Sequence, residues 1–370
     1  MKQTRKWLAM LLALCMLVPL FGLSALAVDK MTNDPGSTKQ WGMKAVGMDE
    51  AWGMGPTGKG VKVGIIDCGL STLTGDIAKS RVEAGPNYTG SIGDSATDIE
   101  GHGTFVAGII GAAKDNGVGI AGVAPECNFY IVKALSDMAD AVDDCVKAGC
   151  QVINMSMGSP SAAKAKALKV AVDAAAAAGV IVVASVGNEG TASGPDQYNY
   201  PAAFDSAIGV GCVDQNLNVS VFSNKNDSVF VVAPGEKIAS LSLLPGVVST
   251  QDGTSFSAPY VTGLAALLLE MNPSMNLEEF KEILMATSDD LSAEGYDINA
   301  GYGMINVPAA LRYAAEKWGY ELSDPSAPTE PDQPDNPGTG WNIFDFSWIR
   351  NLFQSIIRNL FKGWTPSFSL

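Results

Sequence analysis

The chain has 370 residues, of which 47% are hydrophobic and 17% charged, and it contains a single histidine. This composition is that of an ordinary globular protein, and it excludes a disordered, collagen-like or many-helix membrane protein. The net charge of −15 gives no basic surface for nucleic acid, so we expect no nucleic-acid partner.

The first 27 residues have the pattern of a secretory signal peptide. Residues 1–6 are basic, residues 7–23 are mainly apolar, and Ala-Leu-Ala at 25–27 is a small-x-small cleavage site. An uncleaved membrane anchor, which is the alternative, usually needs a longer apolar run. We therefore expect a secreted or extracellular protein.

Residues 28–322 alternate between short β-rich runs and helical patterns. The predicted strands are nearly continuous apolar runs, as expected for strands covered on both faces: residues 61–67, 129–134, 151–155, 180–185, 208–212 and 229–233. The predicted helices are residues 104–113, 138–148, 162–178, 255–271 and 277–287. This alternation predicts a three-layer α/β domain, with a mostly parallel sheet and helices on both faces. Ligands of such sheets bind beyond the carboxyl ends of the strands.

Three polar residues lie where strands end or helices begin. Asp67 ends the first predicted strand, and a carboxylate there is costly unless it is hydrogen-bonded or paired. His102, the lone histidine, lies between two glycines at a helix start. Ser255 precedes another helix, where free N–H groups could stabilise an oxyanion. Taken singly, these residues could equally be a turn residue, a core or surface histidine and a helix cap.

The segments around these residues resemble the signatures of the subtilisin-like serine proteases. GIIDCGL, GHGTFVAG and GTSFSAPYVTG occur in the family's order Asp, His, Ser, and VGNEG at 186–190 resembles a fourth motif. The resemblance runs from about Asn33 to Val307. It implies a serine endopeptidase that acts on peptide or protein substrates through an acyl-enzyme, without a redox cofactor. The implied catalytic residues are Asp67, His102, Ser255 and the oxyanion donor Asn188.

The same resemblance implies where the substrate binds. It assigns the two walls of the primary specificity pocket to residues 154–158 and 184–187. Small residues there leave room for a large apolar or aromatic side chain, and Glu189 at the rim would also tolerate a basic one. A plain buried sheet position is the alternative for Met157. The implied substrate contacts are Ser156, Met157, Gly158, Ala184, Ser185, Gly187 and Glu189.

A structural calcium site is also implied by the resemblance. In the family, the loop after the His helix, here residues 114–120, supplies oxygen ligands together with Asp76 and Gln40. Carboxylate, amide and carbonyl oxygens suit Ca²⁺, although Asn-Gly in this loop is equally a turn signal. The implied ligands are Gln40, Asp76, Lys114, Asn116, Val118 and Ile120.

Three features depart from the family pattern. Only about a dozen residues separate Ala27 from Gln40, where the family usually carries a folding pro-domain. Ser136-Asp137 leads straight into a helix, where the family has a Gly-rich segment that pairs with extended peptide, so the distal subsites are in question. Cys68 stands beside Asp67, near enough to the chemistry for a bulky thiol reagent to inhibit.

The cysteines give no metal or disulfide framework. Five remain beyond residue 27, an odd number without a CxxC pair, so we expect buried free thiols. Closure of a small loop between Cys145 and Cys150 is an alternative that the sequence leaves open.

The C-terminal residues form two further predicted segments. Residues 323–340 are acidic, with proline at every third position from 325 to 337, which predicts an extended linker. Residues 341–370 contain an apolar helical stripe at 349–364 opposite a basic, polar face. This amphipathic helix suits contact with a membrane surface or cell envelope. The alternative is packing on the protease domain or on another copy.

Two other functions compete with a general secreted endopeptidase. One is a catalytically silent binding module that keeps the protease fold, although the intact Asp67, His102, Asn188 and Ser255 argue against it. The other is a dedicated surface processing protease with one partner substrate.

Overall fold

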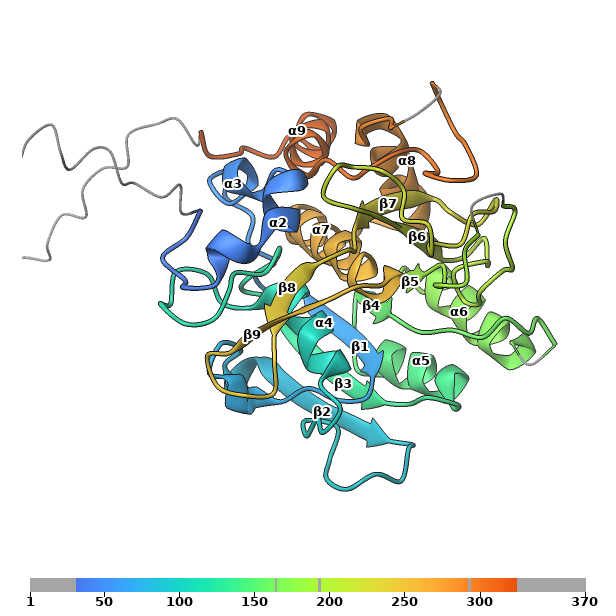
Figure 1. Ribbon diagram of the computed structural model, residues 1–370, viewed down its shortest axis with the longest axis horizontal. Coiled ribbons are helices and arrows are strands. Elements are labelled where there is room, and N and C mark those ends of the chain that lie inside the picture. Colours follow the sequence, from blue (N-terminus) through green and yellow to red (C-terminus); the bar gives the residue numbers. More distant parts are fainter. Residues whose placement is uncertain (1–30, 164, 192–193, 292–293, 325–370) are drawn as a thin grey trace, which may run out of the picture. The chain divides into compact units, whose positions relative to one another are not determined.

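A parallel sheet of seven strands organises the molecule (Figure 1). The computed structural model describes residues 31–324, apart from residues 164, 192–193 and 292–293. In chain order the strands are β1 (Lys62–Asp67), β2 (Val82–Asn87), β3 (Asn128–Lys133), β4 (Val152–Met155), β5 (Ile181–Ser185), β6 (Ile208–Val213) and β7 (Val231–Pro234). Their order in the sheet is β2-β3-β1-β4-β5-β6-β7, and every neighbouring pair is parallel.

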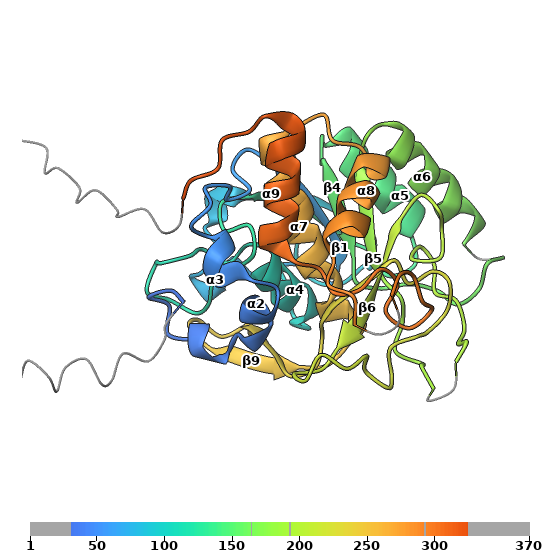
Figure 2. The same ribbon diagram turned by 90° about the horizontal axis from the view of Figure 1, so that it is seen from above.

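Helices cover both faces of the sheet (Figure 2). Helices α4 (His102–Gly111) and α7 (Ala258–Met271) lie on one face, and α5 (Met138–Lys147) and α6 (Lys166–Ala177) lie on the other. Side chains alternate along each strand. In β1, Val63 and Ile65 therefore pack with α4 and α7, whereas Ile66 packs in the core beneath α5 and α6. The predicted three-layer α/β fold is confirmed.

The remaining elements surround this frame. They are α2 (Trp41–Ala45), α3 (Met48–Ala51), α8 (Leu277–Thr287), α9 (Val307–Trp318) and an antiparallel pair, β8 (Ile238–Leu241) with β9 (Val248–Gln251). Four short 3-10 helices are η1 (Ser37–Lys39), η2 (Thr72–Thr74), η3 (Lys79–Arg81) and η4 (Thr254–Phe256). A capping box at Asn276 and Glu279 begins α8, which matches the predicted helix 277–287.

The sequence predicts six of the seven sheet strands and misses several peripheral elements. The missed sheet strand, β2, lies at the edge, is half exposed and contains Gly and Pro, so it lacks the apolar run of a buried strand. The sequence analysis also did not predict the short strands β8 and β9 or the helices α2, α3 and α9. The predicted helix 255–271 is divided into η4 and α7.

The topology gathers three strand ends at one edge of the sheet. Strands β1, β4 and β5 are neighbours and end at Asp67, Met155 and Ser185. Because the strands are parallel, the residues that follow them come together. No helix within the described residues is long and apolar enough to cross a membrane. The predicted signal peptide and the predicted C-terminal amphipathic helix lie outside the described residues, as does the predicted linker apart from residues 323–324.

Candidate active site

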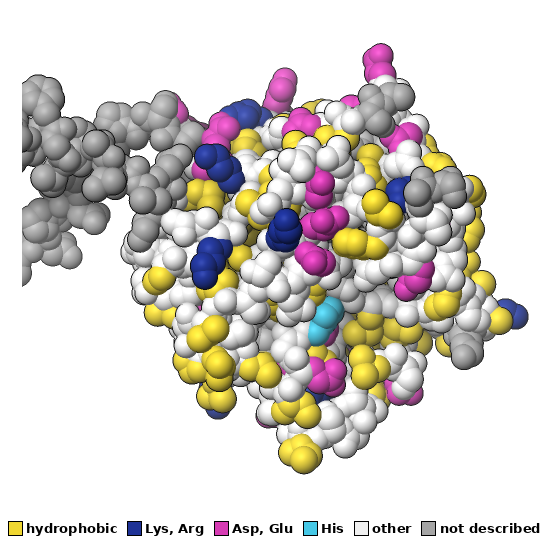
Figure 3. Space-filling view, viewed as in Figure 1, with side chains coloured by type: hydrophobic (Ala, Val, Ile, Leu, Met, Phe, Trp, Pro, Cys, Tyr) yellow, Lys and Arg dark blue, Asp and Glu magenta, His cyan; other side chains and the backbone are white. Residues whose placement is uncertain are grey.

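Asp67 and His102 form a close pair between β1 and α4. Nδ1 of His102 lies 2.9 Å from Oδ1 and 3.0 Å from Oδ2 of Asp67. The carboxylate is buried, with 1% of its side chain exposed, whereas a third of the imidazole reaches the surface (Figure 3). Gly103 permits this approach, because a Cβ there would overlap the carbonyl oxygen of Gly69. A buried acid thus holds one ring nitrogen, Nδ1, and leaves the other, Nε2, unbound by that carboxylate.

The surroundings of His102 change its basicity and fix its ring. Burial works to lower the pKa of His102, but the charge and hydrogen bond of Asp67, followed by the charges of Asp98 and Glu100, raise it above its usual value. The ring of Phe256 packs on the imidazole with a centroid distance of 5.4 Å. Since Phe256 follows Ser255 in the chain, this contact joins the helix start of His102 to the segment of Ser255.

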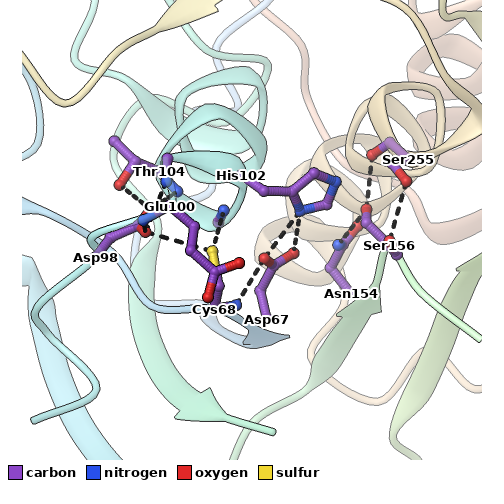
Figure 4. Close-up of polar contacts among 11 residues, drawn as sticks. Asp67, Cys68, Asp98, Glu100, His102, Thr104, Asn154, Ser156 and Ser255 are labelled. Atoms are coloured by element: carbon purple, nitrogen blue, oxygen red, sulfur yellow. Dashed lines mark hydrogen bonds and ion pairs between the residues drawn. The ribbon is translucent and has the colours of Figure 1, made fainter. Parts of the chain in front are cut away.

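Ser255 lies in η4, on the other side of the imidazole from Asp67 (Figure 4). Its Oγ donates a hydrogen bond to the main-chain carbonyl of Ser156, at 3.0 Å. In return, Oγ of Ser156 donates to the carbonyl of Ser255, at 2.7 Å. Among the described residues, the hydroxyl of Ser255 makes no hydrogen bond with His102. Rotation of the Ser255 side chain would have to release Ser156 before the hydroxyl could donate to the imidazole.

A chain of neutral hydrogen bonds supports this serine pair from the core. The Asn154 amide donates to Oγ of Ser156 at 2.9 Å, and its oxygen accepts from Thr262 of α7 at 2.9 Å. Asn154 and Thr262 are both fully buried. The segment of Ser255 is therefore connected through β4 to the helix that follows it.

Asn188 follows β5 and faces the same cleft. Its side-chain oxygen accepts hydrogen bonds from the N–H and the hydroxyl of Thr254, both at 2.8 Å. These two bonds orient the amide, because an amide oxygen that accepts leaves its NH₂ group free to donate. The first N–H groups of a helix also lack partners within it, which applies to Ser255 at the start of η4.

A cleft of about 170 Å³ lies beside Ser255. It brings together six of the seven predicted substrate contacts, namely Ser156, Met157, Gly158, Ser185, Gly187 and Glu189. The seventh, Ala184, is fully buried and packs in the core beneath α5 and α6. The cleft is also lined by Asn188, Ser255 and three residues that sequence reasoning missed: Pro160, Gln197 and Asn199.

Asn199 closes one side of the cleft from a distant loop. Its amide donates to the carbonyl of Ser185 at 3.1 Å, and Tyr200 beside it pairs with Ser159 in an antiparallel bridge. A Cβ at Gly158 would lie only 2.5 Å from this amide, so the wall needs glycine there. No local pattern in residues 194–200 signals this role, because the contacts join residues 14 to 41 positions apart.

Glu189 at the rim is not a freely presented charge. Its Oε2 accepts the main-chain N–H of Asn188 at 3.0 Å and the Asn224 amide at 3.2 Å. Its own N–H donates to Asn224 at 2.9 Å. The carboxylate thus holds the turn that carries Asn188, while its charge still borders the cleft.

Comparisons with known proteins show which family the chain belongs to. A family model described as the subtilase family, Peptidase_S8, matches residues 58–303. The chain belongs to the subtilase family. Subtilases are serine endopeptidases, so the chain is a hydrolase of this class, and the silent binding module is not favoured.

Individual subtilases cover most of the described domain. Subtilisin DY of Bacillus licheniformis is 37% identical over 282 residues, 74% of this chain and 98% of that protein. Subtilisin BL of Lederbergia lenta is 36% identical with the same coverage. Among solved structures, MycP1 with its N-terminal propeptide removed matches with a TM-score of 0.64 and 28% identity, over 73% of this chain and 97% of that one.

The loop implied to bind calcium is folded by hydrogen bonds in this subtilase. Asp76 is buried and accepts the N–H of Ile120 at 2.9 Å and the Asn116 amide at 2.8 Å. The oxygen of Asn116 accepts from Val118 at 2.7 Å. The Gln40 amide donates to the carbonyl of Ala121 at 2.8 Å and accepts its N–H at 3.1 Å. Five of the six implied ligands therefore lie together, namely Gln40, Asp76, Asn116, Val118 and Ile120. The side chain of the sixth, Lys114, pairs with Asp115.

These residues supply oxygens that suit a cation, but they are now engaged with one another. Asn116 directs its NH₂ group at Asp76, and the amide oxygens of Asn116 and Gln40 each accept one N–H, which leaves each a second lone pair. Burial raises the pKa of Asp76 to about 6. Among the described residues, no group of three or more acidic, Cys or His side chains could hold a metal.

The described cysteines are free and buried. Cys68 is 4% exposed, and burial followed by the charges of Asp67 and Asp98 raises its pKa well above the usual range. A protonated, shielded thiol reacts slowly, which disfavours the predicted attack by a bulky thiol reagent. Cys145 and Cys150 lie close together around Gly64 but are not bonded.

Proposed function

We propose that this subtilase hydrolyses peptide bonds through Ser255, His102 and Asp67. The observation that carries the proposal is the bidentate approach of the buried Asp67 carboxylate to Nδ1 of His102, with Ser255 on the opposite side of the ring. A carboxylate on Nδ1 leaves Nε2 as the ring nitrogen that accepts a proton.

The chemistry then follows in a fixed order. The hydroxyl of Ser255 leaves the carbonyl of Ser156, gives its proton to Nε2 of His102, and attacks the scissile carbonyl carbon. Asp67 stabilises the imidazolium that forms. His102 next protonates the departing amine, which leaves an acyl group on Ser255. Water, deprotonated by His102, releases the acyl group and restores the serine.

The oxyanion of the tetrahedral intermediate would be held by Asn188 and the N–H of Ser255. The two bonds from Thr254 to the Asn188 oxygen support this role, since they fix the amide before substrate binds. Donors that are already oriented stabilise developing charge without reorganising during the reaction.

The test is digestion of casein by the wild type and two serine variants. Ser255→Ala should remove all measurable cleavage above background. Ser257→Ala is the matched control, because its hydroxyl is only two residues away but donates to the carbonyl of Pro234. It should keep most of the activity. Digestion by folded Ser255→Ala at the wild-type rate would overturn the proposal, and cleavage at only one sequence would favour the dedicated processing protease.

For specificity, we propose cleavage after large apolar or aromatic residues. Gly158 and Gly187 leave the cleft open, while Glu189 brings one negative charge to its rim. Peptide libraries should rank Phe, Leu, Tyr or Met first at the cleaved position, with Lys or Arg weaker. In Glu189→Gln, cleavage after basic residues should fall by about tenfold relative to cleavage after apolar ones. An unchanged ratio would contradict a role for this charge.

Calcium binding by Gln40, Asp76, Lys114, Asn116, Val118 and Ile120 is a separate proposal. It is supported by the oxygen chemistry of the loop, and it requires the Asn116 amide to release Asp76. Melting temperature should then be higher in millimolar Ca²⁺ than with a chelator, and Asp76→Asn should remove the difference. Equal melting temperatures of the wild type in both buffers would overturn it.

Secretion and surface association complete the proposal. Residues 1–27 support secretion, and a relative 34% identical over 286 residues, of which the chain covers 42%, is named minor extracellular protease Epr of Bacillus subtilis. Residues 349–364 support contact with a membrane surface or cell envelope. Co-sedimentation with anionic vesicles should be lost on deletion of residues 341–370, and equal pelleting of both chains would exclude this contact.

A further inference from the structure

Helix α4 begins with His102, and its N-cap residue makes no side-chain hydrogen bond to the helix. Its N-cap is Gly101, which has no side chain and has a φ of 93°. The first N–H groups of a helix need acceptors from outside it. In this protein the acceptor is Asp98, a carboxylate that is only 7% exposed and lies four residues before His102.

Both oxygens of Asp98 hold the main chain around His102. Oδ1 accepts the N–H groups of Glu100 and Gly101, at 2.9 and 2.8 Å. Oδ2 accepts the N–H and the hydroxyl of Thr104, at 2.9 and 2.6 Å. Burial alone would raise the pKa of Asp98, yet these bonds hold it below its usual value, so the group is an anion. Asp98 therefore accepts hydrogen bonds from residues on both sides of His102 in the chain.

A thiol links this cap to the strand that carries Asp67 (Figure 4). Sγ of Cys68 donates to Oδ1 of Asp98 at 3.3 Å and accepts the N–H of Gly103 at 3.2 Å. The N–H of Cys68 donates to Oδ1 of Asp67 at 2.7 Å. One residue thus contacts the acid partner of the imidazole, its helix, and the cap of that helix.

We propose that Asp98 is a positioning residue for the Asp67–His102 pair, acting through the start of α4 and through the Cys68 thiol. The inference rests on the proposed function, in which this pair activates Ser255. Asp98 is not a catalytic residue, because none of its hydrogen bonds is to the imidazole. A misplacement of about 1 Å in a catalytic group costs on the order of 100-fold in rate, so loosening this cap should reduce turnover.

Two effects of Asp98 can be separated. Asp98→Asn keeps the shape of the side chain but replaces one carboxylate oxygen with an NH₂ group. That group cannot accept from the donors that the oxygen held, so the cap is broken. The substitution also removes a negative charge near the imidazole. Glu100→Gln is the matched control for charge, since Glu100 is exposed, also raises the pKa of His102 and caps nothing through its side chain.

The experiment measures kcat and KM across pH, together with an NMR titration of the imidazole, which is unambiguous because the chain has one histidine. In Asp98→Asn, kcat on its pH plateau should fall by about 10- to 100-fold with KM little changed. The imidazole midpoint should move to lower pH in both variants. In Glu100→Gln the plateau kcat should stay at the wild-type value. Equal plateau kcat in both variants would overturn the inference.

A second pair of variants tests the thiol link even if Asp98→Asn fails to fold. Cys68→Ser keeps a donor and acceptor at this position, whereas Cys68→Val keeps the bulk and loses both. We expect the serine variant to exceed the valine variant about tenfold in kcat, at a temperature where melting curves show both to be folded. Equal kcat in the two variants would overturn the link. Failure of the proposed function would differ from both results, because the wild type itself would then show no cleavage that depends on Ser255.

Discussion

The two halves of the proposed active site are held by different forces. Asp67 and His102 are fixed by buried charge, with a second carboxylate, Asp98, capping the helix of His102. Ser255 is fixed by neutral hydrogen bonds with Ser156. Hydrogen bonds to charged groups are about twice as strong as neutral ones and respond to pH. The charged half should therefore set the pH response, and the neutral half should set only the position of the nucleophile.

The largest effect should come from the charged half, in Asp67→Asn. The amide can no longer stabilise the imidazolium and favours the wrong tautomer, a change known to cost about 10⁴ in kcat in the trypsin triad. Steady-state kinetics at the pH optimum, with melting curves to verify folding, measure it. Asp140→Asn on the exposed side of α5 is the control and should be neutral. A loss below about tenfold would contradict the assignment of Asp67.

The next effect should come from Asn188→Ala on the neutral side. Loss of this oxyanion donor should reduce kcat by about 10²–10³, the cost known for subtilisin, with little change in KM. Thr254→Val, measured beside it, removes only one of the two bonds that orient the amide and should cost less. The assignment of Asn188 fails if the alanine variant changes KM alone.

A smaller effect is expected for Ser156→Ala. It removes the hydroxyl that donates to the carbonyl of Ser255 and accepts from the Asn154 amide, but it keeps the main-chain carbonyl that accepts from the Ser255 hydroxyl. Of the two neutral hydrogen bonds lost, only one contacts Ser255. It contributes about 1 kcal/mol, so kcat should fall about fivefold. The acid limb of the pH profile should not move. A shifted limb would show that the two halves are not independent.

The smallest effect is a shift of the pH profile by Glu100→Gln. The charge of Glu100 favours the protonated imidazole and contributes to the raised pKa of His102. Without this charge, the pKa of His102 falls and its basic form persists to lower pH. The acid limb of the kcat/KM profile therefore moves to lower pH. Because Glu100 is exposed, the shift should be small and should shrink at high salt. An acid limb that moves to higher pH would contradict this prediction.

The two halves also differ in how far the sequence predicts them. His102 and Asp67 lie in short motifs at an element start and end, so their types and order are visible without the fold. The reciprocal bonds of Ser156 and Ser255 join residues 99 positions apart, and no local pattern signals them. Asp98 lies in the loop before α4 and could have been recognised only as a carboxylate near a helix start that lacks a capping side chain.

The cleft beside Ser255 shows how far motifs alone predict a site. Ser185 lines it and Ala184 does not, because successive residues of β5 point to opposite faces of the sheet. Asn199 and Gln197 reach the cleft from a loop without periodicity. Likewise, the apolar runs of buried strands predict β1 and β3–β7, whereas the half-exposed edge strand β2 has no such run.

The most direct test of the account is labelling with a fluorophosphonate, followed by mass spectrometry of the modified peptide. The account predicts one adduct, on Ser255, in the folded wild type, with labelling slowed by orders of magnitude in His102→Ala. A folded wild type that takes no label, or an adduct that persists in Ser255→Ala, would contradict it.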